Sequence, residues 1–415
     1  MQLYLALLRQ QRAYRYLWLA SLVSMMGDWF NLVGTVVLVN RYLPSGAAVA
    51  GLFLARMLPP LLLGPLVGVV ADRFNRKQIM IVSDLLRIVI VASFLLVDRV
   101  EKVWLIYALT ALQFAISAFF DPAQAALTPR LLKNPADLLA ANTLGSISWS
   151  AMLALGSAVG GLTATFLGVQ TALLIDALSF LGSALLLSRI VLPSQPPLVE
   201  STQDAPSSWD EFVHGLRYVT ERPQIGIVTL AKSMLQIGSS NLLMTVYASQ
   251  IFVVGEKGAV TFGLLMTASG IGAVLGPILA NQWGDGQLRT LQRAITVSYL
   301  LIALSWLLFG LAQSLPLAIM AILLRSMGGS TVWTYSNTLL QAKVPNQLLG
   351  RVFALDNIFI TLVSSLSLWV TSLALDQLGL GPRHLVLGVA VISLIPALLW
   401  ATGTREQAQP VESYT

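Results

Sequence analysis

Apolar stretches of about 20 residues recur along nearly the whole sequence, and they limit the possible folds more than any other feature. A helix needs roughly 20 mostly apolar residues to cross a bilayer. Only 11% of the 415 residues are charged and 56% are hydrophobic, whereas about a quarter of the residues in a soluble domain are charged. The sequence therefore predicts an all-α membrane protein.

The apolar windows predict 12 transmembrane helices. These cover residues 15–41, 46–71, 79–98, 103–128, 138–167, 169–188, 224–253, 259–283, 293–312, 315–342, 347–378 and 384–403. An even number of spans places both termini on one face. The termini and the even-numbered loops hold sixteen of the 25 Lys and Arg residues, and the opposite face holds five. The positive-inside rule therefore predicts a plasma-membrane protein with both termini in the cytoplasm. The net charge of +6 follows from this loop bias and does not indicate a nucleic-acid partner.

The longest polar stretch divides the chain into two sets of six spans. We predict an N-terminal six-helix bundle at 1–189, a cytoplasmic linker at 190–222 and a C-terminal six-helix bundle at 223–415. Within the linker, Ser208 and Glu211 form a capping box at the start of a short amphipathic helix. That helix is expected to lie on the inner leaflet or on the bundle, and docking to a partner protein is the alternative.

The two halves repeat one another weakly. The stretches "MMGDWFNL", "GPLVG" and "NPADLL" align with "QIGSSNLL", "GPILA" and "VPNQLL" at offsets of 211, 212 and 210. A duplicated six-helix unit is an architecture of secondary transporters, which bind substrate between the halves near the bilayer midplane.

The loop after the second span reads "GPLVGVVADRFNRK" from Gly64 to Lys77. It resembles the signature loop of the major facilitator superfamily. The resemblance implies the fold of that family, two six-helix bundles related by pseudo-two-fold symmetry. Asn75 stands where that family usually has glycine, and asparagine tolerates the left-handed turn better than most residues. The residues that match the motif are Gly68, Asp72, Arg73, Arg76 and Lys77.

The resemblance implies that this loop acts as a cytoplasmic latch. Asp72 would meet the start of the eleventh helix, and Arg73 would meet a carboxylate in the fourth, for which Asp121 is the candidate. Stretches such as "FFDPAQAALTPRLL" and "VPNQLLGRVFA" are similar to the macrolide and enterobactin exporter-like branch of drug:proton antiporters. The fifth span carries "GSAVGG", which resembles the antiporter motif without its proline; close helix packing is the alternative.

Ionisable residues inside spans are costly, so they are candidates for function. Asp28 and Arg56 have similar predicted depths and are expected either to form a structural ion pair or to couple transport to protons. Lys232 and Asp356 also share a depth and form a second coupling candidate.

Four further charges lie within the spans. Asp84 and Arg87 are one turn apart and are expected to satisfy each other. Asp176 is expected to pack inside the N-terminal half. Arg325 has no obvious partner at its depth and is expected to attract an anionic substrate.

Polar and aromatic side chains on the first, fourth, seventh and tenth spans are expected to line a substrate cavity. With Arg325 they are Trp29, Asn31, Gln113, Gln236, Asn241, Trp333, Tyr335 and Asn337. This mixture favours an amphipathic organic solute over a sugar.

The sequence thus predicts a monomeric secondary transporter that exports a drug, macrolide or siderophore-like solute by alternating access, through proton antiport. It has no nucleotide-binding motif, cofactor motif or metal-ligand cluster, and it has no cysteine. An importer or lipid transporter of the same superfamily is the alternative within this class. A membrane receptor or enzyme is the alternative outside it, and the absence of catalytic motifs argues against an enzyme.

Overall fold

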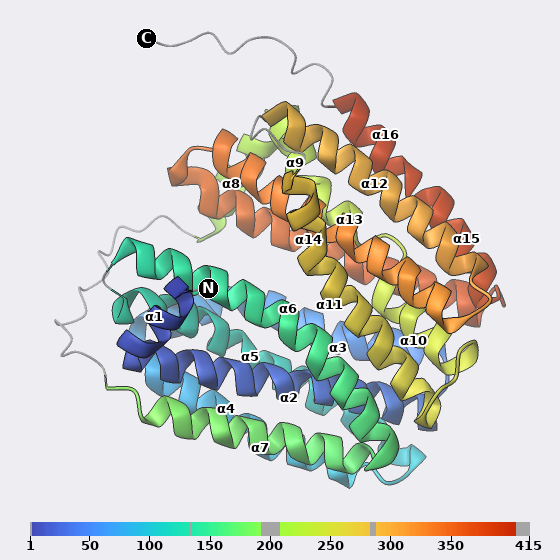
Figure 1. Ribbon diagram of the computed structural model, residues 1–415, viewed down its shortest axis with the longest axis horizontal. Helices are drawn as coiled ribbons and strands as arrows, with labels where there is room; N and C mark the ends of the chain where they lie inside the picture. The colour runs from blue at the N-terminus through green and yellow to red at the C-terminus, as the bar shows by residue number, and fades with distance from the viewer. Residues whose placement is uncertain (1, 133, 192–207, 283–287, 404–415) are drawn as a thin grey trace. The chain divides into compact units, whose positions relative to one another are not determined.

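The computed structural model describes residues 2–132, 134–191, 208–282 and 288–403, and these residues form helices and no strand (Figure 1). The prediction of an all-α protein is confirmed. Within these described ranges, eleven helical segments are long and apolar enough to cross a membrane. The helices of the first part of the chain are α1 (Gln2–Gln10), α2 (Arg12–Tyr42), α3 (Gly46–Arg73), α4 (Arg76–Ser93), α5 (Trp104–Leu131), α6 (Pro135–Phe166) and α7 (Val169–Ser188).

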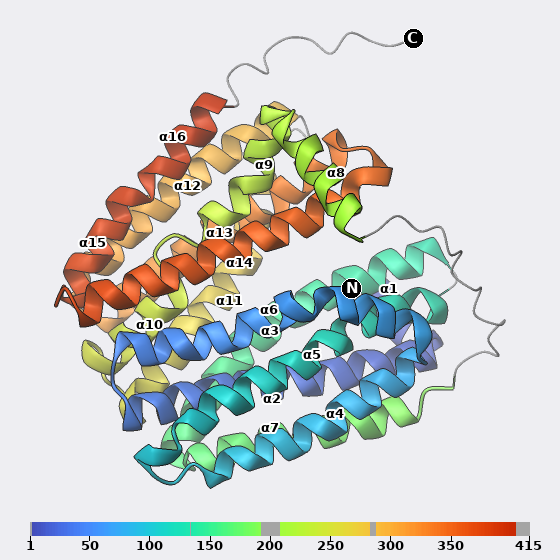
Figure 2. The ribbon, with the colours of Figure 1, turned by 180° about the vertical axis from the view of Figure 1, so that it is seen from behind.

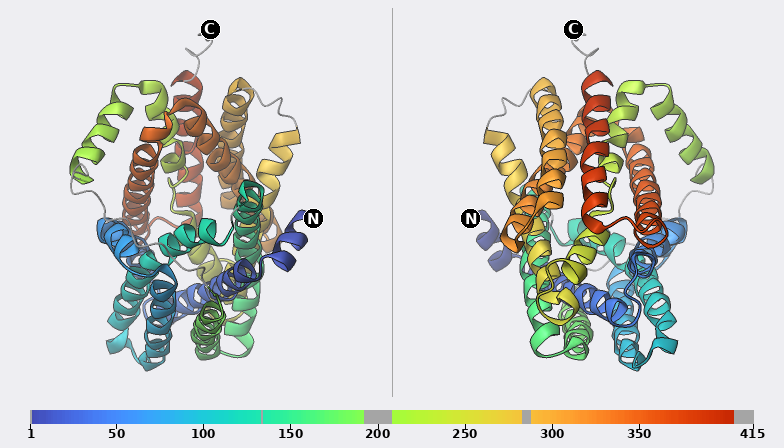
Figure 3. Two further views of the ribbon diagram at one scale, coloured as in Figure 1. Left: turned by 90° about the vertical axis from the view of Figure 1, so that its left-hand side faces the viewer. Right: turned by 90° about the vertical axis from the view of Figure 1, so that its right-hand side faces the viewer.

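The second part of the chain contains the predicted span that the structure divides. That span, 224–253, consists of α9 (Pro223–Met234) and α10 (Ser240–Gln250), which explains why eleven continuous segments are found instead of the predicted 12. The other helices are α8 (Ser208–Thr220), α11 (Ala259–Gln282), α12 (Leu288–Leu311), α13 (Leu315–Lys343), α14 (Asn346–Asp376), α15 (Pro382–Ile392) and α16 (Leu394–Gly403). Figures 1 and 3 show α15 and α16 following one another in line.

The chain forms two compact units. The first contains α1 to α7 together with residues Met244–Ile271, and the second contains Asp204–Leu243 and the chain from Gly272 onward. In the first unit α2 packs along α6 and α7, and α4 lies between α5 and α7 (Figure 2). In the second unit α12 packs against α13, α15 and α16, and α9 packs against α13 and α14. The predicted domain boundaries stay a prediction.

The interruption between α9 and α10 is built from backbone that an α-helix does not use. Gly238 has φ +92° and Ser239 has φ +45°. Glycine adopts positive φ without the steric cost that a Cβ brings. The freed N–H of Gly238 donates to Ser367 Oγ at 2.9 Å, so the break is partly satisfied by α14.

Small residues bring α6 and α11 into backbone contact within the first unit. A Cβ on Gly263 would lie 2.6 Å from the carbonyl oxygen of Ser157, and one on Gly161 would lie 2.7 Å from that of Ala259. The hydroxyl of Thr267 donates to the carbonyl of Ala154 at 2.8 Å. The "GSAVGG" stretch therefore serves close helix packing, the alternative given above.

Asn75 does not adopt the left-handed turn that the sequence predicts. Its backbone is extended, with φ −65° and ψ 117°, and its side chain caps the N-terminus of α4. The carboxamide oxygen accepts from the backbone N–H groups of Lys77 at 3.0 Å and Gln78 at 3.4 Å. Asparagine is a strong N-cap residue, so it replaces glycine here by satisfying free N–H groups at the start of the helix.

The amphipathic helix predicted in the linker is present as α8 and packs on α14 and α9 of the second unit. Nδ1 of His214 lies 3.2 Å from Nη1 of Arg351. A Cβ added to Gly215 would lie 3.0 Å from the Cβ of Arg351. These contacts place α8 on the bundle. The side chains of Ser208 and Glu211 lie outside the described residues, so the capping box stays a prediction.

Candidate functional site

Two groups of buried charges mark the candidate site, and the first lies among α2, α3, α4 and α7. Asp84 and Arg87 form an ion pair at 3.8 Å with both side chains buried, a distance longer than a hydrogen bond, so the two residues satisfy each other's charge as predicted but not each other's hydrogen bonds. The guanidinium of Arg87 also lies over the rings of Phe120 at 4.6 Å and Phe180 at 4.8 Å. The aromatic faces help to hold the buried cation in place.

Asp28 and Asp176 lie on neighbouring helices of this unit. Asp176 is fully buried, and neither of its carboxylate oxygens has a hydrogen-bond partner among the described residues. A Cβ on Gly27 would lie only 2.5 Å from Asp176 Oδ1, which shows how closely α7 approaches α2 beside Asp28. The two carboxylates lie within electrostatic reach of each other. The side-chain amide of the buried Asn31 lies within reach of the Asp176 carboxylate.

Arg56 lies near these acids without an ion pair to either of them in the described part of the chain. Its guanidinium lies 4.3 Å from the centre of the Phe114 ring, and its Nη1 is buried without a hydrogen-bond partner. The acids that act on it electrostatically are Asp28 and Asp176. Arg56 is therefore held by an aromatic face and by the field of the two acids instead of by the direct pairing with Asp28 considered above.

We call Asp28, Asp84, Asp176, Arg56 and Arg87 the N-terminal charged cluster. It contains three carboxylates and two guanidinium groups. An unmatched charge away from water is costly, and a buried carboxylate avoids that cost by taking up a proton or pairing with a cation. The cluster has more carboxylates than guanidinium groups, so a carboxylate within it can take up a proton.

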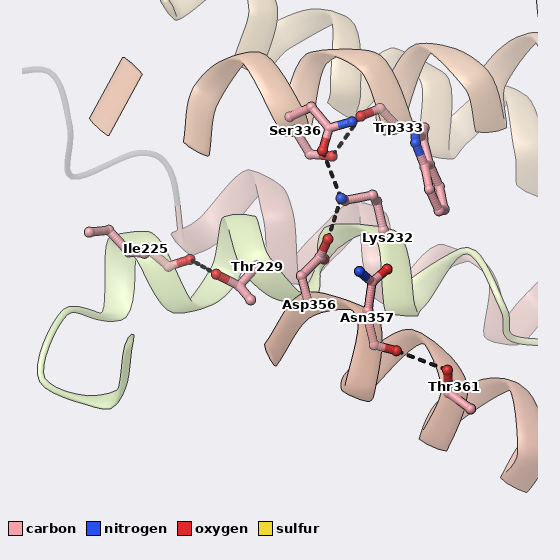
Figure 4. Close-up of polar contacts among 9 residues, drawn as sticks. Ile225, Thr229, Lys232, Trp333, Ser336, Asp356, Asn357 and Thr361 are labelled. Atoms are coloured by element: carbon pink, nitrogen blue, oxygen red, sulfur yellow. Dashed lines mark hydrogen bonds and ion pairs between the residues drawn. The ribbon is translucent and has the colours of Figure 1, made fainter. Parts of the chain in front are cut away.

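The second group of charges lies in the second unit, where Lys232 and Asp356 form the predicted ion pair (Figure 4). Both side chains are buried, with 3% and 1% of their surface exposed. The ammonium also donates to Asn337 Oδ1 at 2.7 Å. It lies 4.9 Å from the centre of the Trp333 ring and 5.3 Å from that of Phe353. We call these five residues the Lys232 site.

Arg325 is not the isolated cation that the sequence predicts. Its Nη2 donates to the carbonyl of Leu235 at 3.3 Å, and its guanidinium lies 5.1 Å from the centre of the Trp306 ring. Leu235 follows the last residue of α9, where carbonyl groups lose their intrahelical partners. Arg325 therefore caps the interrupted span, a partner that depth along the helices does not reveal.

The predicted cavity residues differ in their exposure. Asn31, Gln113 and Tyr335 are buried, whereas Asn241 and Trp333 are exposed. Trp29, Gln236 and Asn337 are half-buried, and Trp29 packs edge-on against Trp149 with ring centres 6.4 Å apart. Their role in lining a cavity stays a prediction.

Two cations of the gating motif donate hydrogen bonds to backbone carbonyls of the first unit. Lys77 donates to the carbonyls of Ser188 and Ile190, both at 2.8 Å, and so caps the C-terminus of α7. Arg76 donates to the carbonyl of Ala126 on α5 at 3.3 Å. Asp121 is exposed on α5. The side chains of Gly68, Asp72 and Arg73 lie outside the described residues, so the latch contacts of Asp72 and Arg73 stay a prediction.

Sequence reasoning brought Lys232 and Asp356 together, and the structure has them as an ion pair, but it did not place Asp176 beside Asp28. A signal for Asp176 exists in the sequence. Asp176, Ser179, Phe180 and Ser183 recur at helical spacing, and all four are buried in α7. Such a repeat marks a polar inward face. Phe353 was missed because no charge pattern distinguishes it from lipid-facing phenylalanines.

A family model described as "Transmembrane secretion effector" matches residues 4–374. An uncharacterized MFS-type transporter of Bacillus subtilis is 25% identical over 405 residues, covering 94% of this chain and 93% of the relative. A putative bacilysin exporter of Bacillus subtilis is 25% identical over 355 residues, covering 85% and 86%. Macrolide efflux protein A of Streptococcus pyogenes is 24% identical over 391 residues, covering 91% and 93%.

The fold is similar to those of solved transporters. The crystal structure of a bacterial homologue of the iron transporter ferroportin, in an inward-facing state, superposes with a TM-score of 0.72 at 16% identity, covering 95% of this chain and 99% of that one. A bacterial homologue of the human lysosomal transporter Spinster gives a TM-score of 0.70 at 14% identity, covering 97% and 99%. The chain belongs to the transmembrane secretion effector family of major facilitator transporters.

Proposed function

We propose that this transporter is a secondary exporter that moves an amphipathic organic solute out of the cell in exchange for protons. The observation that carries the proposal is the N-terminal charged cluster, in which three carboxylates lie with two guanidinium groups. Proton antiport needs a buried group that gains and loses a proton during the cycle, and the unmatched carboxylate fits that need.

Asp28 and Asp176 are the proposed carriers of the proton. With both ionised, two negative charges on α2 and α7 repel each other across the close approach at Gly27. A proton on one carboxylate oxygen removes this repulsion and weakens the hold of the acids on Arg56. A change in charge inside the bundle shifts the populations of the inward- and outward-open states, which is how proton entry drives transport.

Export of an organic solute is supported by the relatives. One is named for bacilysin export and another for macrolide efflux. The mixture of amides and aromatic rings among the proposed cavity residues suits such a solute. We further propose that the protein lies in the plasma membrane with both termini in the cytoplasm, on the strength of the cation bias in the loops. The proposed transporter acts as a monomer.

Replacement of Asp28 by Asn tests the proposal. Asp28→Asn removes the ionisable group with little change in volume, so we expect proton-linked efflux to be lost while the protein still reaches the membrane. Solute movement driven by an imposed pH gradient is measured in proteoliposomes. Asp98→Asn is the matched control, because Asp98 is an exposed loop acid held by Arg99 and Lys102.

Two outcomes would contradict parts of the proposal. Unchanged gradient-driven transport by Asp28→Asn would remove Asp28 as the coupling residue. Accumulation in right-side-out vesicles instead of inverted ones would show import, the alternative direction within the superfamily.

A further inference from the structure

The Lys232 site has the chemistry of a receptor for a cation. A carboxylate, an amide oxygen and two ring faces surround one ammonium group, at the positions given above. Carboxylate and carbonyl oxygens accept hydrogen bonds from an ammonium, and aromatic faces attract its charge. Four groups of this site therefore favour a cation, whereas Lys232 alone would favour an anion.

The carboxylate of Asp356 depends on Lys232. Asp356 is 1% exposed, and apart from the ion pair neither of its oxygens has a hydrogen-bond partner among the described residues. Without Lys232 the buried carboxylate would lose the one counter-charge that pairs with it in the described part of the chain, and it would require another cation or a proton.

The position of Lys232 allows another cation to replace it. Lys232 lies in the last turn of α9, just before the interruption at residues 235–239. On one side of the site Trp333 is 41% exposed, and Asn357, which Figure 4 draws beside Asp356, is also exposed. The lysine side chain is a flexible four-carbon stem, and its place at a helix end favours its movement toward that side.

We infer that the Lys232 site binds the protonated amine of an organic solute, and that Lys232 fills this site as a tethered substitute while the solute is absent. The inference rests on the proposed function only in that the amine belongs to the exported solute. The Asp356 carboxylate and the Asn337 amide bind the solute ammonium, and Trp333 and Phe353 cover its charge.

Chemical rescue of Lys232→Ala tests the chemistry of the site directly. The full-length variant is purified and its melting temperature is measured with n-butylammonium, n-butanol or butyrate. We expect butylammonium to raise the melting temperature by about 2 °C, since a ligand that binds only the folded state stabilises it. Butanol and butyrate should have no such effect, and Lys232→Ala combined with Asp356→Asn should not respond to butylammonium.

The matched control is Lys102→Ala. Lys102 also pairs with an aspartate, Asp98, at 2.9 Å, but the two side chains are 36% and 53% exposed. Water replaces the lost ammonium at that pair, so no rescue is expected. An equal response to butanol, a response to butyrate, or rescue that persists in the double variant would each overturn the inference.

A second measurement uses the protein with Lys232 in place, and so does not depend on the folding of Lys232→Ala. Cells producing the wild type or Asp356→Asn are exposed to toxic solutes that differ only by acetylation of one amine. We expect the wild type to protect about tenfold better against the free amine, and Asp356→Asn to lose this preference. Equal protection against both forms would overturn the inference. Absence of protection against either form would contradict export, while the rescue experiment still decides the chemistry of the site.

Discussion

Glycine at position 27 sets the spacing of the N-terminal charged cluster. Its missing side chain lets Asp176 and Ser179 of α7 lie directly against α2. The sequence alone gave Asp28 as a candidate, because an acid inside an apolar window is unusual and its depth follows from the rise of the helix. It did not identify Asp176 as the neighbour of Asp28, since the rotation of α7 about its axis depends on packing with several helices at once.

We predict that Gly27→Ala disturbs this spacing. The new Cβ would lie 2.5 Å from Asp176 Oδ1 and 2.8 Å from Ser179 Cβ, and overpacking of this kind costs about 1–3 kcal/mol. A lower melting temperature and reduced proton-driven transport are expected. Gly145→Ala on α6 is the control, because a Cβ there meets no atom within 4 Å. Equal behaviour of the two variants would show that the close approach at Gly27 is unimportant.

At the scale of the helices, the sequence predicted the spans well and their interruptions poorly. Apolar length determines where a chain can cross a membrane, so eleven of the predicted spans correspond to continuous apolar segments. The division of 224–253 was missed because "QIGSS" also fits inside a helix. The break depends on distant partners: Ser367, which accepts from Gly238, and Arg325, which donates to Leu235.

We predict that Arg325 stabilises this interrupted span. Arg325→Met removes the donor to the Leu235 carbonyl, and an unsatisfied buried carbonyl costs about 1–3 kcal/mol. We expect a lower melting temperature in thermal unfolding of the purified protein. Arg325→Lys keeps the cation over Trp306 and should lose less stability. A melting temperature of Arg325→Met at or above that of the wild type would exclude the capping role.

At the scale of the whole chain, residues from both predicted bundles share the first compact unit. Arg41 at the end of α2 forms an ion pair with Glu256, just before α11, and α6 packs closely on α11. Sequence repeats predicted two equal halves, but they carry no information about which helices remain in contact in a given state. Which helices stay in contact depends on small residues such as Gly161 and Gly263, whose contact partners lie about a hundred positions away in the sequence.

We predict that the pair between Arg41 and Glu256 holds α6 and α11 together. The chain has no cysteine, so Ser157→Cys, buried where α6 meets α11, reports on separation of these helices by its labelling rate. Glu256→Gln should speed labelling by about fivefold, because a partly exposed pair contributes up to about 1 kcal/mol. Reversing both charges should restore slow labelling, and a cysteine at the exposed Ser188 should be unaffected. Unchanged labelling of Ser157→Cys would mean that the pair does not control separation.

The turn at Gly238 and Ser239 has a mechanical consequence. Torsion about these two residues disturbs the hydrogen bonds of the turn, from Ser239 N–H to the Gln236 carbonyl at 3.2 Å and from Leu243 N–H to the Ser239 carbonyl at 3.1 Å, but leaves the bonds inside α9 intact. Helix α9, which bears Lys232, is therefore able to rotate about its own axis while its internal hydrogen bonds stay intact. The departure of one ammonium group from Asp356 can in this way become a rotation of α9 that the turn absorbs, so that α10 is left in place.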